Sequence, residues 1–136
     1  MSTTFVRKVH FEEVDAAGIV FFARFFNYCH DAMEAFFDAV PGGYTGLITQ
    51  RKIGFPAVHI DASWKAPLKY GDSAKLEVSV IKIGTTSVTF RYHVTRVSDG
   101  VHAATVEHVA VSTDLVTMTK IPLPEDCRVL LESHRA

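Results

Sequence analysis

The sequence predicts an α+β fold in which a single long helix packs against an antiparallel sheet. Apolar residues recur every three or four positions over residues 23–39, which is the spacing of one helix face. Apolar and polar residues alternate over residues 74–80 and 88–95, which is typical of strands with one buried and one solvated face. Because both kinds of element have an apolar side to bury, a sheet wrapped around the helix is the expected architecture.

The remaining elements follow in order along the chain. We expect a short strand at residues 5–11, and we expect the helix to end at the Pro-Gly-Gly sequence of residues 41–43. The Ser-Asp-Gly sequence at residues 98–100 indicates a hairpin turn between two strands. The four longer strands are expected at residues 56–66, 74–80, 88–95 and 101–113.

The expected helix is apolar around much of its circumference. Phe25 and Phe37 widen the apolar stripe, and Glu34 lies on the opposite side, where we interpret it as a solvated residue. The stripe comprises Phe22, Phe26, Cys29, Met33, Phe36 and Val40. The polar side comprises Arg24, Asn27, Asp31, Glu34 and Asp38. Most of the helix phenylalanines are therefore expected to build the core.

Composition places the chain among ordinary globular proteins. With 48% hydrophobic and 21% charged residues, residues 1–136 are expected to form one domain with its own core. The formal net charge of −1 argues against general binding to nucleic acids or to anionic membranes. The longest apolar run, residues 16–23, is much shorter than the ~20 residues of a membrane helix.

The N-terminus and the cysteines indicate a cytoplasmic protein, and the histidines give no indication of a metal site. Residues 1–13 lack the apolar centre of a signal peptide. Cys29 and Cys127 form no CxxC or CxxH motif, so we expect two free thiols. The histidines show no spacing typical of zinc ligands, and a metal is therefore not expected.

Asp15 is the residue that most needs a functional interpretation. It precedes Gly18 and a dense apolar run, and it is the one acidic residue of the segment 14–26. Burying an ionised carboxylate without partners is costly, so Asp15 must either form a turn or helix cap or point into a site. The serines lack a G-x-S-x-G context, so a serine nucleophile is not expected.

Four short motifs stand in a fixed order over nearly the whole chain. The first runs from Asp15 through Gly18 to Phe22, an acid and a glycine followed by aliphatic and aromatic residues. The others are Trp64-Lys65-Ala66-Pro67 with Gly71-Asp72, then Gly84-Thr85-Thr86-Ser87, then Asp114 to Lys120 with Pro122 and Pro124. Together they resemble the hotdog-fold acyl-CoA thioesterases of the 4-hydroxybenzoyl-CoA thioesterase type.

Two further segments narrow this resemblance. Residues 28–32 of the expected helix and residues 56–59 of the following strand are similar to 1,4-dihydroxy-2-naphthoyl-CoA hydrolases. The branch associated with short-chain acyl-CoA tends to carry histidine at position 22, whereas Phe22 is closer to the tyrosine of hydroxybenzoyl enzymes. The resemblance therefore implies a hotdog fold and hydrolysis of a CoA thioester with an aromatic acyl group.

The resemblance also implies roles for the first motif. Asp15 would act as a nucleophile toward the thioester carbonyl or as a general base toward water. Gly18 would allow a sharp turn close to the ligand, and the backbone amide of Phe22 would donate to the oxyanion from the start of the helix. Ile19, Val20 and Phe22 would line the acyl pocket.

Substrate contacts are also expected outside this motif. His59 either contacts a polar substituent of the acyl group or is a structural histidine. Thr85, Thr86 and Ser87 occupy the hairpin that holds the coenzyme A phosphates in relatives, but the basic residues of some aromatic-acyl thioesterases are missing there. The basic residues that could replace them are Arg51, Lys52, Lys65, Lys69, Lys82 and Arg91.

The implied partner is a small-molecule acyl-CoA substrate, with no cofactor beyond the coenzyme A of the substrate itself. A homodimer or homotetramer is implied as well, because an open sheet edge tends to be paired. Three alternatives remain open: a thioesterase for short-chain aliphatic acyl-CoA or acyl-carrier-protein, an acyl-thioester hydratase or dehydratase, and a non-catalytic acyl-CoA-binding module. His59 beside Asp15 would favour the hydratase or dehydratase.

Overall fold

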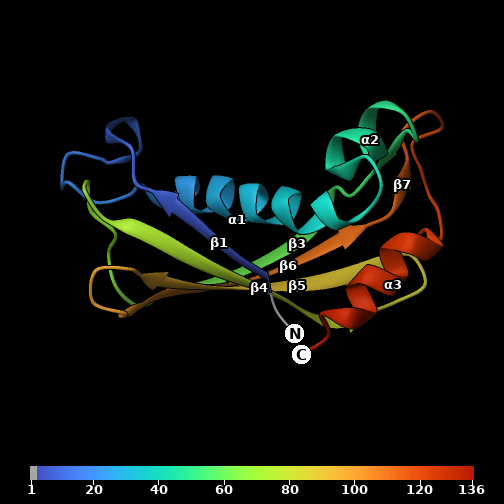
Figure 1. Cartoon of the computed structure of the whole chain (residues 1–136). Coiled ribbons are helices and arrows are strands. Elements are labelled where there is room, and N and C mark those ends of the chain that lie inside the picture. Colours follow the sequence, from blue (N-terminus) through green and yellow to red (C-terminus); the bar gives the residue numbers. More distant parts are fainter. Residues whose placement is uncertain (1–2) are drawn as a thin grey trace.

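The fold of residues 3–136, described by a computed structural model, is a two-layer arrangement. Five strands form an antiparallel sheet in the order β1-β4-β5-β6-β3, and the long helix α1 (Phe22–Phe36) lies along one face of this sheet (Figure 1). The strands are β1 (Thr3–Lys8), β3 (Ala57–Trp64), β4 (Ser73–Ile83), β5 (Ser87–Arg96) and β6 (His102–Val111). The predicted α+β class, with one long helix against an antiparallel sheet, is confirmed.

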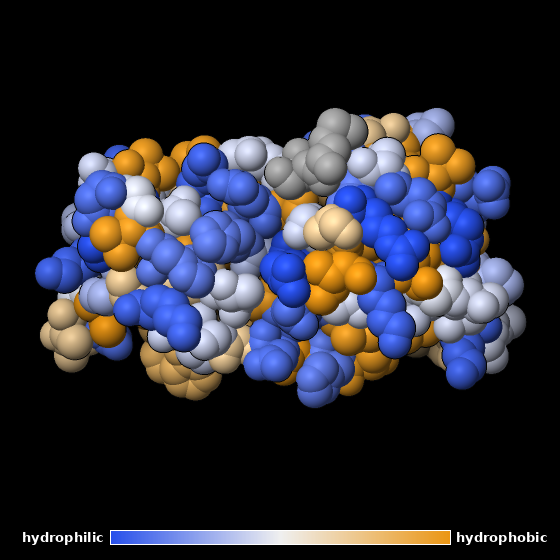
Figure 2. All heavy atoms as spheres, turned by 90° about the horizontal axis from the view of Figure 1, so that it is seen from below, coloured by the Kyte–Doolittle hydropathy of each residue, from blue (hydrophilic) through white to orange (hydrophobic). Residues whose placement is uncertain are grey.

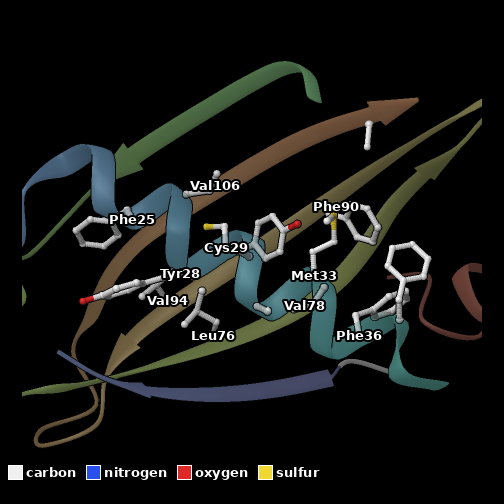
Figure 3. Packing of buried hydrophobic residues seen from close by; sticks show 14 of the residues in the cluster. Phe25, Tyr28, Cys29, Met33, Phe36, Leu76, Val78, Phe90, Val94 and Val106 are labelled. Atoms are coloured by element: carbon white, nitrogen blue, oxygen red, sulfur yellow. The ribbon is translucent and has the colours of Figure 1, made fainter. Parts of the chain in front are cut away.

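Helix α1 is held by apolar contacts with the inward face of the sheet. Its buried residues are Phe25, Tyr28, Cys29, Ala32, Met33 and Phe36. They pack with inward-facing strand residues such as Leu76, Val78, Phe90 and Val106, which alternate with half-buried neighbours (Figure 3). Complete burial of one such large apolar side chain stabilises the fold by about 1.5–3 kcal/mol, so this interface joins the two layers.

The expected apolar stripe of the helix is correct in its second half and wrong at its start. Cys29, Met33 and Phe36 are buried, but Phe22 is 57% exposed and Phe26 is half-buried. The first turns of the helix carry four aromatic residues, Phe22, Phe25, Phe26 and Tyr28, so the position of the sheet decides which of them is covered. Phe22 is left open to the first of the clefts described below.

Short elements complete the fold, and two of them are helices that the sequence pattern did not indicate. Helix α2 (Gly43–Thr49) follows the loop that ends α1, and α3 (Glu125–Ser133) lies near the C-terminus. The other short elements are η1 (Phe11–Glu13), η2 (Phe37–Ala39), β2 (Ile53–Gly54), β7 (Thr113–Asp114) and β8 (Thr119–Lys120). Residues 9–11, expected to belong to the first strand, lie outside β1, and Phe11 already begins η1. No helix within residues 3–136 has the length and hydropathy needed to cross a membrane.

The face of the sheet opposite α1 is largely hydrophilic (Figure 2). Ion pairs lie across this face, with Arg91 Nη2 3.0 Å from Glu107 Oε2 and Lys75 Nζ 3.4 Å from Glu77 Oε1. These side chains are partly solvated, so each pair contributes at most about 1 kcal/mol to stability. The two clefts described below lie on the helix side of the sheet.

The two cysteines are expected to be unreactive in the folded protein. Both are free and buried, and burial raises the pKa of each thiol to about 12. Because the thiolate is the reactive species, we expect 5,5′-dithiobis(2-nitrobenzoate) to modify Cys29 and Cys127 only after unfolding. Absorbance of the released thionitrobenzoate measures this. Rapid labelling of the native protein would contradict the burial of these residues.

Candidate active site

A tight turn presents Asp15 at the protein surface. The Asp15 carbonyl accepts the Gly18 N–H at 2.9 Å, and the Asp15 N–H donates to the Ile19 carbonyl at 2.9 Å. Gly18 has a φ of 78°, a left-handed conformation that strains residues with a side chain. The Asp15 carboxylate accepts the Ala17 N–H at 2.8 Å, which uses one of its oxygens. Asp15 is therefore a turn residue whose exposed carboxylate can also act on a ligand.

The start of helix α1 presents a backbone amide without an acceptor. Phe21 is the N-cap residue, and its side chain cannot accept a hydrogen bond from the helix. Among the nearby amides, the Phe21 N–H donates to the Glu13 carbonyl at 3.0 Å and the Arg24 N–H to the Phe21 carbonyl at 2.8 Å. The Ala23 N–H, in the first turn of the helix, has no acceptor within residues 3–136. Within residues 3–136, no acceptor receives the N–H of Phe22. This amide is free to bind an oxygen atom of a ligand.

Asp15 and Phe22 border one cleft with a volume of about 560 Å³. Its lining comprises Asp15, Ile19, Val20, Phe21, Phe22, Phe25, Trp64, Lys65, Ala66 and Pro67. Part of this lining is aromatic: the Trp64 ring lies nearly perpendicular to Phe22 and to Phe25, with centroid distances of 6.2 and 6.0 Å. The cleft thus combines an acid, a free amide and an apolar surface that fits a planar group.

Sequence reasoning identified one side of this cleft and missed the other. Asp15, Ile19, Val20 and Phe22 line it as predicted. The sequence predicts a ligand role only for Lys65 in the segment from Trp64 to Pro67, yet all four residues line the cleft. Just beyond them, Ile19 forms a bridge with Lys69. That contact joins segments 50 residues apart in the chain, and no local pattern reports it.

Trp64 offers a direct probe of the cleft because it is the one tryptophan of the chain and lines the ligand surface. Its side chain is 41% exposed, so a ligand in the cleft should displace water from the indole. We expect an aromatic acid or its CoA thioester to quench or blue-shift tryptophan emission with a saturable dose dependence. Unchanged emission at a concentration that saturates turnover would place the ligand elsewhere.

Four of the predicted substrate contacts lie outside this cleft in a single chain. His59 is exposed on β3, five residues from Trp64 and thus about 16 Å along the strand. Thr85, Thr86 and Ser87 lie at the far end of β4 from the cleft, and β4 alone spans eleven residues, or about 36 Å. The chain by itself does not bring these residues to Asp15, and their roles stay predictions.

A buried ionic cluster around Glu13 holds the loop that carries Asp15. The Glu13 carboxylate is 3% exposed and accepts hydrogen bonds from Tyr28 Oη at 2.7 Å, Arg7 Nη2 at 2.6 Å and the His10 N–H at 2.8 Å. The Arg7 guanidinium lies 4.3 Å from the centre of the Tyr28 ring. Since the Glu13 carbonyl holds the Phe21 amide, this cluster fixes both ends of the loop that carries Asp15.

Within residues 3–136, no three His, Cys, Asp or Glu residues gather as a metal site would require. The Asp15 carboxylate and the Phe22 amide can act directly on a molecule bound in the cleft. Attack on an electrophilic carbonyl, with its developing negative oxygen on the Phe22 amide, is chemistry that they can perform.

Comparison with known proteins identifies the family. Residues 9–131 match the family model of the thioesterase-like superfamily. A 1,4-dihydroxy-2-naphthoyl-CoA hydrolase of Nostoc punctiforme is 32% identical over 135 residues, which covers 99% of this chain and 90% of the relative. A thioesterase superfamily structure from Jannaschia sp. CCS1 has a TM-score of 0.91 at 24% identity and covers 99% of this chain and 94% of its own. A 1,4-dihydroxy-2-naphthoyl-CoA thioesterase structure from Synechocystis has a TM-score of 0.85 at 22% identity, covering 96% of both chains. The chain belongs to the thioesterase-like superfamily and has the hotdog fold that its motifs predicted.

Proposed function

We propose that the protein hydrolyses acyl-CoA thioesters with an aromatic acyl group, releasing the free acid and coenzyme A. The observation that carries this proposal is the presence of the Asp15 carboxylate and the free Phe22 amide in one aromatic cleft. The activity named for the Nostoc relative, hydrolysis of 1,4-dihydroxy-2-naphthoyl-CoA, supports the same reaction and an aromatic substrate.

The reaction uses two groups of the cleft. Asp15 accepts a proton from water, the resulting hydroxide adds to the thioester carbonyl, and the carbonyl oxygen becomes an oxyanion. Alternatively, the Asp15 carboxylate adds to the carbonyl itself, and water later hydrolyses the anhydride. In both routes the Phe22 N–H donates to the oxyanion, and its collapse breaks the C–S bond to release the coenzyme A thiolate. One such donor is typically worth about 3–4 kcal/mol in the transition state.

Coenzyme A binding is proposed to use a lysine at the mouth of the cleft. Among the candidate basic residues, Arg51 pairs with Asp126 at 2.7 Å and Arg91 pairs with Glu107 at 3.0 Å. Lys65 lies exposed in the cleft lining, where its ammonium can reach a phosphate. The hydroxyls of residues 85–87 are proposed to bind coenzyme A only if another chain brings them near.

A dimer is proposed because β3 is an unprotected sheet edge. It pairs with β6 on one side only, and its exposed residues include the apolar side chains of Val58, Ile60 and Trp64. An exposed apolar edge strand pairs readily with another strand. Antiparallel pairing of two β3 strands would continue the sheet across two chains, as a homodimer or as the building unit of a homotetramer.

Thiol release from a panel of thioesters tests the function. The panel contains benzoyl-, hydroxybenzoyl- and dihydroxynaphthoyl-CoA, short and long alkyl-CoA, and an acyl-carrier-protein thioester. Rapid release from the aromatic members supports the proposal, and faster release from alkyl or carrier-protein members supports the first alternative. Conversion of an enoyl-CoA without thiol release would indicate a hydratase. Binding that perturbs Trp64 emission without any turnover would indicate a non-catalytic module.

A further inference from the structure

A second cleft, of about 330 Å³, lies at the other end of helix α1. Met33 of α1, Tyr44 of α2 and Phe55 are among its lining residues, and the imidazoles of His30 and His108 also border it. Met33 follows Phe25 of the catalytic cleft by eight residues, or about 12 Å along the helix. The two clefts are thus separate sites in one chain.

His108 is the polar group at the base of this cleft. It lies on β6, is 9% exposed and packs beside two aromatic rings: the centroid of its imidazole is 5.9 Å from that of Phe90 and 6.0 Å from that of Tyr92. His108 Nδ1 is 3.0 Å from the hydroxyl of Tyr92. Burial and the neighbouring His30 lower the pKa of His108, so the ring is neutral at physiological pH.

The hydrogen bond with Tyr92 decides which nitrogen of His108 carries the proton. The Tyr92 side chain is fully buried, and within residues 3–136 its hydroxyl has His108 Nδ1 as its hydrogen-bond partner. If Nδ1 carried the proton, the buried hydroxyl hydrogen of Tyr92 would have no acceptor, which costs about 1–3 kcal/mol. Tyr92 therefore donates to Nδ1, and the proton of His108 resides on Nε2.

The Nε2–H group of His108 opens onto the cleft without a protein acceptor. The fully buried side-chain polar atoms that lack a hydrogen-bond partner within residues 3–136 are Arg7 Nη1, which has only an ion-pair contact with Asp31, and Ser112 Oγ. His108 Nε2 has no hydrogen-bond partner in this part of the chain and is not among these atoms, so it is not sealed inside the protein. It lies on the opposite side of the ring from Nδ1, and the ring borders the cleft. An oriented donor at the base of an apolar pocket is the usual form of a small-molecule site.

We propose that this cleft binds a planar aromatic group that carries an oxygen acceptor, with the Nε2–H of His108 donating to that oxygen. Tyr44, Phe55 and the His30 ring offer faces and edges for an aromatic group, and Met33 offers a sulfur atom that packs well against one. The single fixed donor selects for one oxygen, such as a phenolic hydroxyl, at a defined position on the ring.

Two sources can supply such a group. One is a free aromatic alcohol or acid that binds the chain by itself. The other rests on the proposed function: it is the aryl end of a thioester held in the catalytic cleft of a second copy. Strand β3 begins with Ala57 at this cleft and ends with Trp64 at the catalytic cleft. If two β3 edges paired in the antiparallel direction, this cleft of one chain would therefore lie near the catalytic cleft of the partner chain.

Binding of 2-naphthol and of naphthalene, followed by NMR, tests the site. The substitution His108→Phe keeps the aromatic stack and removes the donor, and His102→Phe is the control on the outer face of the same strand. We expect 2-naphthol to bind His108→Phe about five- to tenfold more weakly than wild type or the control, with naphthalene unaffected. Nitrogen chemical shifts should show the proton of His108 on Nε2 and move upon binding.

Turnover measurements distinguish between the two sources of the aromatic group. If His108→Phe loses more kcat/KM for hydroxynaphthoyl-CoA than for naphthoyl-CoA, the thioester is the source. If the loss is equal for both thioesters while His108→Phe still binds 2-naphthol, but not naphthalene, more weakly than wild type, the source is a free ligand. The double substitution His108→Phe with Tyr92→Phe leaves no buried hydroxyl unpaired and serves if the single variant unfolds. Equal naphthol affinity in all variants, or a proton on Nδ1, overturns the proposal. Absence of all turnover in wild type would refute the proposed function alone.

Discussion

Replacing Asp15 with asparagine is expected to lower kcat for an aromatic acyl-CoA by about 10²–10⁴-fold, with KM nearly unchanged. An amide cannot take a proton from water, nor can it attack the thioester as a carboxylate does. Its side-chain oxygen can still accept the Ala17 N–H that Asp15 accepts at 2.8 Å, so the turn should keep its shape. Steady-state thiol release, with the substrate in excess over each variant, measures kcat and KM.

The matched control is Glu12→Gln, which removes an exposed carboxylate from the neighbouring η1 without touching the cleft lining. This variant should retain turnover within about a factor of two. If Asp15→Asn were equally active, the aspartate would serve the turn alone, and the chemistry would need another acid. Loss of activity in both variants would indicate a general effect of charge on CoA binding rather than a role for Asp15.

The sequence predicted an element correctly where the local spacing of its apolar residues is enough to determine it. The alternation on β4 and β5 and the spacing of Cys29, Met33 and Phe36 on α1 appear in the structure because each element has a single apolar side. Helix α2 was missed because its seven residues include glycines and threonines, which are weak helix formers, and burial of Leu47 is what holds it. Tertiary packing, rather than propensity, creates such elements.

The same distinction applies to the candidate site. Asp15, Gly18 and Phe22 lie within eight consecutive residues, so one motif sufficed to find them. The aromatic wall at Trp64 depends on contacts between distant segments, and so does the cluster around Glu13. A pattern in one segment carries no information about which distant side chain will meet it.

Replacing Glu13 with glutamine is expected to reduce the free energy of unfolding by about 3 kcal/mol at neutral pH. The change leaves Arg7 as a charge without its carboxylate partner, although Arg7 Nη1 keeps Asp31 Oδ2 at 3.2 Å. Because the cluster holds the loop through the Phe21 amide, kcat should also fall. Urea unfolding followed by circular dichroism, at one fixed protein concentration, measures the stability.

The pH dependence of this effect follows from the pKa of Glu13. Burial opposes its ionisation, but the His10 amide, the Tyr28 hydroxyl and Arg7 outweigh burial, and the pKa lies below its ordinary value of 4.5. A carboxyl group with a lowered pKa stabilises the fold fully above its unfolded pKa and loses this contribution as the pH falls through the folded value. The difference between wild type and Glu13→Gln should therefore be largest near neutrality and shrink below about pH 4.5.

Glu107→Gln is the matched control, because Glu107 also binds an arginine, Arg91 at 3.0 Å, but on the solvated face of the sheet. Solvent screens that pair, so its loss should cost less than about 1 kcal/mol. A similar small loss in Glu13→Gln would mean that water reaches the Glu13 cluster and that the loop is held by its backbone bonds alone. A loss that is large but independent of pH would assign the effect to packing around Tyr28 instead of to the ionised carboxylate.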